Sequence, residues 1–181
     1  DIFHNAPEVN LVALYGPEHG VRGEFTAGEY VEFETDPSTG LPVYSLYGKT
    51  RKPSPEMLKG LDMLVYDIQD IGSRSYTFIS TLGLVMEAAA ENGIPLVVLD
   101  RPNPLGGIRM EGAVTRPGFF SFVSQFAIPY IHGMTVGELA TFLNGEKMLA
   151  NGVVCGLHIV KMTGWQRDMH FGDTGLPWVP S

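Results

Sequence analysis

The chain has 181 residues, about the length of one domain, and 44% of them are hydrophobic, which is enough for a core and excludes intrinsic disorder. Its 12 basic and 20 acidic residues give a net charge of −8, so we expect no nucleic-acid partner. The single cysteine, Cys155, excludes an intrachain disulfide framework and a cysteine-built zinc site, and no apolar run approaches the roughly 18 residues of a membrane helix.

Four short apolar runs predict strands covered on both faces, as in a parallel sheet: 10–16, 62–68, 94–100 and 157–162. The segment 76–92 between two of them has apolar residues at helical spacing and ends at Gly93, a typical left-handed helix cap. Thr135 and Glu138 have the spacing of a capping box, which predicts a further helix.

The alternation of strands and helices predicts an α/β fold with a doubly wound, mostly parallel sheet. Ser54 and Pro55 predict the start of a short helix, and segments 30–34 and 42–47 predict a β-hairpin inserted in a crossover. We expect one domain over 1–181. The opening residues 1–7 resemble the end of a helix, so we expect the chain to be an excerpt that lacks a first strand and helix.

Polar loops rich in Gly and Pro follow three of the predicted strands, at 16–23, 67–74 and 100–107. In open α/β sheets, ligands bind outside the carboxyl ends of the strands. The three loops therefore predict one site.

Glu18 is the leading candidate, because Pro17 fixes the backbone before it while Gly16 and Gly20 permit close approach. The position suits a general acid or a nucleophile. A glutamate that caps a helix or pairs with a neighbouring arginine is about equally plausible. The adjacent His19 is a candidate to orient Glu18, to bind a metal or to pack against the loop.

Asp67 and Gln69 share one face of an extended segment. The carboxylates of Asp67 and Asp70 are candidates to hold a cation, although Asp67 is equally suited to cap the following helix. For Asp70 and Arg74, the spacing favours an internal salt bridge.

Asp100 and Arg101 lead into a stiff turn between two prolines, where we favour a structural role for Asp100 and ligand binding for Asn103. Asn103 has the alternative of bonding its own backbone. Glu111 is a candidate second carboxylate or a solvated acid on a β-segment. His132 is expected near a helix N-terminus, where backbone N–H groups attract anions.

Five aromatic side chains offer flat faces of the kind on which sugars stack, although aromatic residues are more often part of the core: Tyr44, Tyr47, Tyr76, Trp165 and Trp178. The chain contains no GxGxxG, GxxxxGK[ST] or GxSxG motif. We therefore predict no nucleotide cofactor and no serine-hydrolase elbow.

A series of linked blocks resembles one family, the bacterial exo-β-N-acetylmuramidases of the NamZ type: GPEHGVRG (16–23), LPVYSLYG (41–48), DIQDIGSRSYT (67–77), VLDRPNPLGG (98–107), HGMTVGELA (132–140) and GLPWVPS (175–181). Typical members have Phe where this chain has Val21. The resemblance implies that the chain is most of a Rossmann-like N-terminal domain, that a smaller C-terminal domain is missing, and that no cofactor is needed.

The resemblance also implies release of N-acetylmuramic acid from the non-reducing ends of peptidoglycan fragments, during cell-wall recycling outside the cytoplasm. The family's catalytic glutamate carries over to Glu18. The candidate pocket residues carried over with it are His19, Arg22, Asp67, Gln69, Arg74, Asp100, Arg101, Asn103, Glu111 and His132.

Glycoside cleavage needs a proton donor for the leaving oxygen and a group that meets the oxocarbenium-like centre. We expect Glu18 to be the acid or acid/base, with Glu111 or a carboxylate of 67–70 as its partner. The guanidinium expected to bind the lactyl carboxylate of muramic acid is that of Arg22, Arg74 or Arg101.

Two alternatives remain at this point. One is a metal-dependent hydrolase in which Glu18, His19, Asp67 and Asp70 hold a divalent cation. The other is a sugar-binding domain without enzymatic activity.

Overall fold

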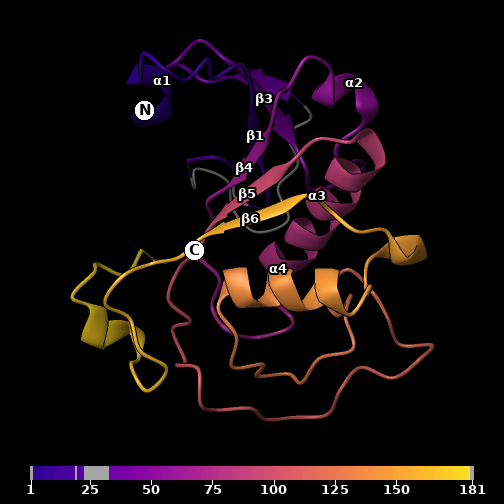
Figure 1. Ribbon diagram of the computed structural model, residues 1–181, viewed down its shortest axis with the longest axis vertical. Helices are drawn as coiled ribbons and strands as arrows, with labels where there is room; N and C mark the ends of the chain where they lie inside the picture. Colours follow the sequence, from indigo (N-terminus) through magenta and orange to yellow (C-terminus); the bar gives the residue numbers. More distant parts are fainter. Residues whose placement is uncertain (1, 19, 23–32, 180–181) are drawn as a thin grey trace. The chain divides into compact units, whose positions relative to one another are not determined.

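The structure, a computed structural model, describes residues 2–18, 20–22 and 33–179 of the chain (Figure 1). The contacts divide it into two compact units, one up to Leu61 and the other from Asp62 onward. The prediction of a single domain over 1–181 stays a prediction. None of the helices in these described ranges combines the length and the apolar character that a membrane crossing requires.

The first unit contains a three-stranded sheet in the order β1-β3-β2. Its elements are α1 (Ile2–Asn5), β1 (Leu14–Gly16), β2 (Phe33–Thr35), β3 (Pro42–Ser45) and α2 (Pro55–Leu58). The helix at the start of the chain and the short helix after Ser54 are confirmed, and the Ser54 hydroxyl accepts a hydrogen bond from the backbone N–H of Met57.

The predicted hairpin is confirmed for β2 and β3, which pair antiparallel, while residues 30–32 lie outside the described part of the chain. Its turn closes through a hydrogen bond of 2.8 Å from the Gly40 N–H to the Asp36 carbonyl. β3 also pairs parallel with β1, which was not predicted. The hairpin therefore belongs to the same sheet as the strand that leads to Glu18.

The second unit is a parallel sheet in the order β4-β5-β6 with two main helices. Its elements are β4 (Leu64–Tyr66), α3 (Phe78–Asn92), β5 (Leu96–Leu99), α4 (Val136–Gly145), the 3-10 helix η1 (Ala150–Gly152), β6 (Leu157–Val160) and the 3-10 helix η2 (Phe171–Thr174). All three predicted strands are present, each shorter than predicted. The alternation β4-α3-β5 is the expected parallel crossover unit.

The core of this unit lies between α3, α4 and the sheet. Leu82 and Met86 of α3, Leu139 of α4 and Leu96 and Val98 of β5 are fully buried. Burial alternates along β4, where Val65 is 42% exposed between two buried neighbours. The strands are parallel as predicted, but within the described unit β4 is not covered on both faces.

The helix ends follow the predicted capping chemistry. Gly93 closes α3 with φ 66°, a left-handed conformation that side chains other than glycine rarely adopt. At the start of α4, the Thr135 hydroxyl accepts from the Glu138 N–H and the Glu138 carboxylate accepts from the Thr135 N–H, so the capping box is complete. Cys155 is buried, and burial raises the pKa of its thiol.

Candidate active site

Glu18 stands in the loop that follows β1, two residues beyond the last strand residue, Gly16. Pro17 is buried, and its carbonyl accepts a hydrogen bond of 3.1 Å from the Gly20 N–H, which turns the chain sharply around Glu18. A Cβ on Gly16 would come within 3.3 Å of Gly20 Cα, so the close approach predicted for this turn is confirmed. His19 lies outside the described residues.

The Glu18 side chain is half-buried and has a specific partner, Tyr47. The Tyr47 hydroxyl donates a hydrogen bond to the Glu18 carboxylate, and this bond is the main reason why the pKa of Tyr47 is raised. A carboxylate held in this way has a defined orientation.

Arg22 forms a two-pronged ion pair with Asp36 of the hairpin turn. Its Nε and Nη2 donate to the two Asp36 oxygens at 2.6 and 2.9 Å. Asp36 is 2% exposed and also accepts from the N–H and hydroxyl of Thr39. These hydrogen bonds, that from Arg22 first, hold the pKa of Asp36 well below its usual range. The Arg22 Nε and Nη2 groups, which were expected to bind a substrate carboxylate, therefore already bind the carboxylate of Asp36.

In the second unit, Asp67 and Arg101 follow the neighbouring parallel strands β4 and β5 and form an ion pair of 2.6 Å. Both side chains are partly exposed, at 42% and 39%. Gln69 donates from Nε2 to the carbonyls of Pro102 and Asp70, so it joins the two loops. Asp67, Gln69 and Arg101, all three candidates for substrate binding, therefore also join the two loops.

The predicted salt bridge between Asp70 and Arg74 is wrong. Asp70 instead accepts from the Gly72 N–H at 2.8 Å and lies 3.5 Å from His132 Nε2. Arg74 donates from Nη1 to the carbonyls of Ala113 and Ile128, both at 2.6 Å. The loop after Asp70 carries Arg74 toward backbone acceptors that sequence spacing does not reveal.

Asn103 is 2% exposed, and both ends of its amide bind backbone groups. Its Nδ2 donates to the Met134 carbonyl and its Oδ1 accepts from the Leu105 N–H, both at 2.9 Å. Gly72 lies against it so closely that a Cβ there would come within 2.2 Å of Asn103 Oδ1. The bond to the Leu105 N–H agrees with the alternative in which Asn103 bonds its own backbone, whereas Met134 lies far along the chain. Ligand binding by Asn103 stays a prediction.

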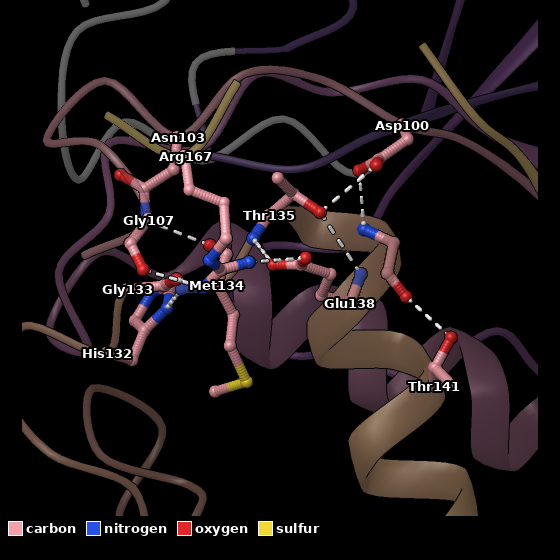
Figure 2. A network of polar contacts seen from close by, with 11 residues as sticks. Asp100, Asn103, Gly107, His132, Gly133, Met134, Thr135, Glu138, Thr141 and Arg167 are labelled. Carbon is pink, nitrogen blue, oxygen red and sulfur yellow. Dashed lines mark hydrogen bonds and ion pairs between the residues drawn. The ribbon is translucent and has the colours of Figure 1, made fainter. Parts of the chain in front are cut away.

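Asp100 caps helix α4 from the end of β5, as Figure 2 shows. Its carboxylate accepts from the Thr135 hydroxyl at 3.0 Å and from the Gly137 N–H at 2.8 Å. The structural role favoured for Asp100 is confirmed. An anion was expected to bind the backbone N–H groups of the helix N-terminus near His132. The Asp100 carboxylate already occupies this N-terminus through the Gly137 N–H.

His132 is 2% exposed and three residues before the Thr135 cap. Its Nδ1 accepts a hydrogen bond from the Met134 N–H at 3.3 Å, and its Nε2 lies 3.5 Å from a carboxylate oxygen of Asp70. Asp70 and His132 thus form a buried pair.

Glu111 pairs with Arg109 at 2.7 Å, and both side chains are more than half exposed. The hydrogen bond from Arg109 lowers the pKa of Glu111. The backbone of Glu111 forms an isolated antiparallel bridge with Ile131, which agrees with a solvated acid on a β-segment. A catalytic role for Glu111 stays a prediction.

Two contacts in the candidate site region were not predicted from the sequence. The first is the bond from Tyr47 to Glu18, since Tyr47 was considered only as a sugar-stacking ring. The second is Arg167, whose guanidinium donates to the carbonyls of Gly107 and Gly133 and pairs with Glu138 at 2.6 Å (Figure 2). No local sequence signal identifies Arg167, because its acceptors are backbone carbonyls far along the chain.

Among the described residues, which do not include His19, no three His, Cys, Asp or Glu side chains are grouped so that they could hold a metal ion.

Comparison with known proteins adds an independent line of evidence. The chain is 54% identical over 179 residues to the protein named peptidoglycan beta-N-acetylmuramidase NamZ of Bacillus subtilis (strain 168), covering 99% of this chain and 42% of that protein. Crystal structures of two DUF1343 family proteins from Bacteroides fragilis NCTC 9343 are also similar. One is 64% identical, with a TM-score of 0.92 over 99% of this chain and 44% of that chain. The other is 35% identical, with a TM-score of 0.79 over 91% of this chain and 42% of that chain.

The chain therefore spans about two fifths of the length of the relatives that it matches. A family model described as "Exo-beta-N-acetylmuramidase NamZ, N-terminal" matches residues 1–181. Because that match runs from the first residue to the last, the chain belongs to the family of N-terminal domains of the exo-β-N-acetylmuramidase NamZ.

Proposed function

We propose that this chain is part of an exo-acting β-N-acetylmuramidase that releases N-acetylmuramic acid from the non-reducing ends of peptidoglycan fragments, with Glu18 as general acid. The observation that carries the proposal is the placement of Glu18, a half-buried carboxyl on a tight turn at the carboxyl end of β1, hydrogen-bonded to Tyr47. Family membership and the name of the Bacillus subtilis relative support the same reaction.

The chemistry asks one carboxyl to protonate the departing sugar oxygen as the glycosidic C–O bond breaks. A carboxyl at the end of a strand suits this task because the sheet holds its backbone while the side chain still reaches solvent. The fixed orientation that the Tyr47 hydroxyl gives to Glu18 serves the same purpose, since proton transfer depends on alignment.

N-acetylmuramic acid differs from N-acetylglucosamine by a lactyl group, whose carboxylate calls for a guanidinium. Of the three predicted arginines, Arg22 and Arg101 already pair with aspartates. Both hydrogen bonds that the Arg74 side chain makes to described residues use Nη1, and its Nε and Nη2 are the donors that we propose for a ligand. Arg74 is therefore the arginine that we propose for the lactyl carboxylate.

A second carboxyl group must face the oxocarbenium-like centre unless the acetamido group of the sugar does so. Among the predicted candidates, Asp70 is buried, whereas Asp67 and Glu111 are exposed to solvent. Glu111 is also kept ionised by Arg109, which suits a group that stabilises positive charge. We propose that Glu111 fills this role.

The proposed substrate is a component of the cell wall. We therefore propose that the protein acts outside the cytoplasm, in cell-wall recycling.

The test is Glu18→Gln in the complete protein, assayed on a peptidoglycan disaccharide and on an aryl N-acetylmuraminide. Loss of a general acid costs roughly 10²–10⁴ in rate. The loss should be larger on the disaccharide, because a sugar leaving group depends more on protonation than an aryl group does. The exposed Glu8, in the same unit, provides a matched control variant, Glu8→Gln, that should retain wild-type turnover.

If Glu18→Gln cleaves the disaccharide within about tenfold of the wild-type rate, the assignment is refuted. Saturable binding of the disaccharide by the wild-type protein without any product would instead support the sugar-binding alternative.

A further inference from the structure

The pairing of β1 with β3 brings a second side chain to Glu18. In this parallel pair, Gly16 lies opposite Ser45, the last residue of β3. Glu18 and Tyr47 each follow two residues after these partners, so both leave the sheet at the same edge. A hydrogen bond of 2.7 Å from the Leu46 N–H to the Gly16 carbonyl extends the pairing beyond the strands.

The loop around Tyr47 is itself held in place. The Ser45 hydroxyl donates to the Tyr47 carbonyl at 3.1 Å, and the Tyr47 N–H donates back to the Ser45 hydroxyl at 3.3 Å. Leu46 between them is 1% exposed and anchors the loop in the core. The backbone of Tyr47 is therefore fixed relative to the strand that positions Glu18.

We propose that Tyr47 is a positioning residue for Glu18: its hydroxyl orients the Glu18 carboxyl and stabilises the carboxylate that forms when the proton leaves for the sugar oxygen. This inference depends on the proposed function, in which Glu18 is the general acid.

The chemistry of the contact favours this role. A hydroxyl that donates to a carboxylate binds it more strongly than it binds the neutral acid, so the hydrogen bond strengthens as Glu18 gives up its proton. The raised pKa of Tyr47, caused chiefly by this bond, keeps the hydroxyl protonated and therefore a donor. Arg51 is the positive charge that acts on the same tyrosine, and it opposes the rise.

Tyr47→Phe removes the hydroxyl and keeps the ring. We expect kcat on the disaccharide to fall roughly 10- to 100-fold, as for loss of a hydrogen bond to a charged group, while KM changes less than about threefold. The basic limb of the pH–rate profile should move to higher pH, because the charged form of the general acid loses a hydrogen bond.

The matched control is Tyr15→Phe. Tyr15 belongs to the same sheet, and its hydroxyl donates to the Met57 carbonyl at 2.6 Å, away from Glu18. This variant also loses one tyrosine hydroxyl and one hydrogen bond, but it should keep the wild-type kcat and pH profile. A loss of kcat common to both variants would mean that a weakened fold, and not positioning, explains the effect.

The decisive experiment is a double-mutant cycle with Glu18→Gln in the complete protein. If Tyr47 acts through Glu18, Tyr47→Phe lowers kcat in the wild-type background and has little further effect in the Glu18→Gln background. Equal losses in both backgrounds, or wild-type kcat in Tyr47→Phe, would overturn the inference. An active Glu18→Gln variant would instead refute the assignment of Glu18 as general acid in the proposed function, so the two failures are distinguishable.

Discussion

Replacing Asp100 with alanine tests whether the strand-end carboxylate holds helix α4 in place. The substitution removes the acceptor for the Gly137 N–H at 2.8 Å and for the Thr135 hydroxyl at 3.0 Å, two donors on buried residues. A buried donor left unsatisfied costs about 1–3 kcal/mol, and loss of a negative charge at a helix N-terminus adds about 0.3–1 kcal/mol. We expect a total destabilisation of about 2–4 kcal/mol.

The geometry around Gly137 limits any compensation. A Cβ at this position would come within 2.8 Å of the Asp100 carboxyl carbon, so the helix N-terminus and the carboxylate are in direct contact. For a chain of this size, each kcal/mol corresponds to about 2–4 °C in Tm, so Asp100→Ala should melt about 5–15 °C lower. Asp100→Asn keeps one acceptor oxygen, so its Tm should lie between those of Asp100→Ala and the wild type.

The assay is thermal and urea unfolding followed by circular dichroism. Asp168→Ala is the control, because Asp168 is exposed and makes no side-chain hydrogen bond to the described residues; it should melt within about 2 °C of the wild type, as expected for an ordinary surface substitution. If Asp100→Ala melts within the same interval, the reasoning about the cap is refuted.

Three further predictions concern charge and catalysis. Hydrogen bonds from Arg22 and Thr39 lower the pKa of Asp36 below its ordinary value of 3.8, so the ionised carboxylate stabilises the fold fully above that pH and this stabilisation is lost as the pH falls below it. The difference in unfolding free energy between wild type and Asp36→Asn should therefore shrink below pH 3.8. A difference that stays constant would contradict the pairing of Asp36 with Arg22. Arg74→Gln should weaken inhibition by N-acetylmuramic acid about tenfold or more and leave inhibition by N-acetylglucosamine unchanged, whereas equal weakening of both would remove Arg74 from lactyl recognition. Turnover should survive exhaustive chelation, and a loss restored by a divalent cation would favour the metal-dependent alternative.

Local signals in the sequence were sufficient for the elements themselves. Gly93, the capping box at Thr135 and the Ser54–Pro55 pair each act within a few residues, and the structure confirms all three. The apolar runs likewise predicted β4, β5 and β6, because continuous Val, Leu and Ile are typical of parallel strands. The tight turn around Glu18 was also predictable from its proline and glycines.

The partners of the polar side chains were decided by tertiary structure. Arg74 was expected to pair with Asp70, four residues away, but its acceptors are the carbonyls of Ala113 and Ile128. The guanidinium of Arg167 likewise binds carbonyls that lie far from it along the chain. Backbone carbonyls occur at every residue, so nothing in the sequence marks which ones a side chain will reach.

The pairing of β3 with β1 is the most consequential feature that sequence did not reveal. The hairpin was predicted from its turn residues, but the register between Gly16 and Ser45 depends on which strands meet after folding. That register brings the Tyr47 hydroxyl to Glu18. The strands, the caps and the candidate acid could be predicted because they depend on neighbours along the chain. The distant groups that bind them could not, because those contacts form only when the chain folds.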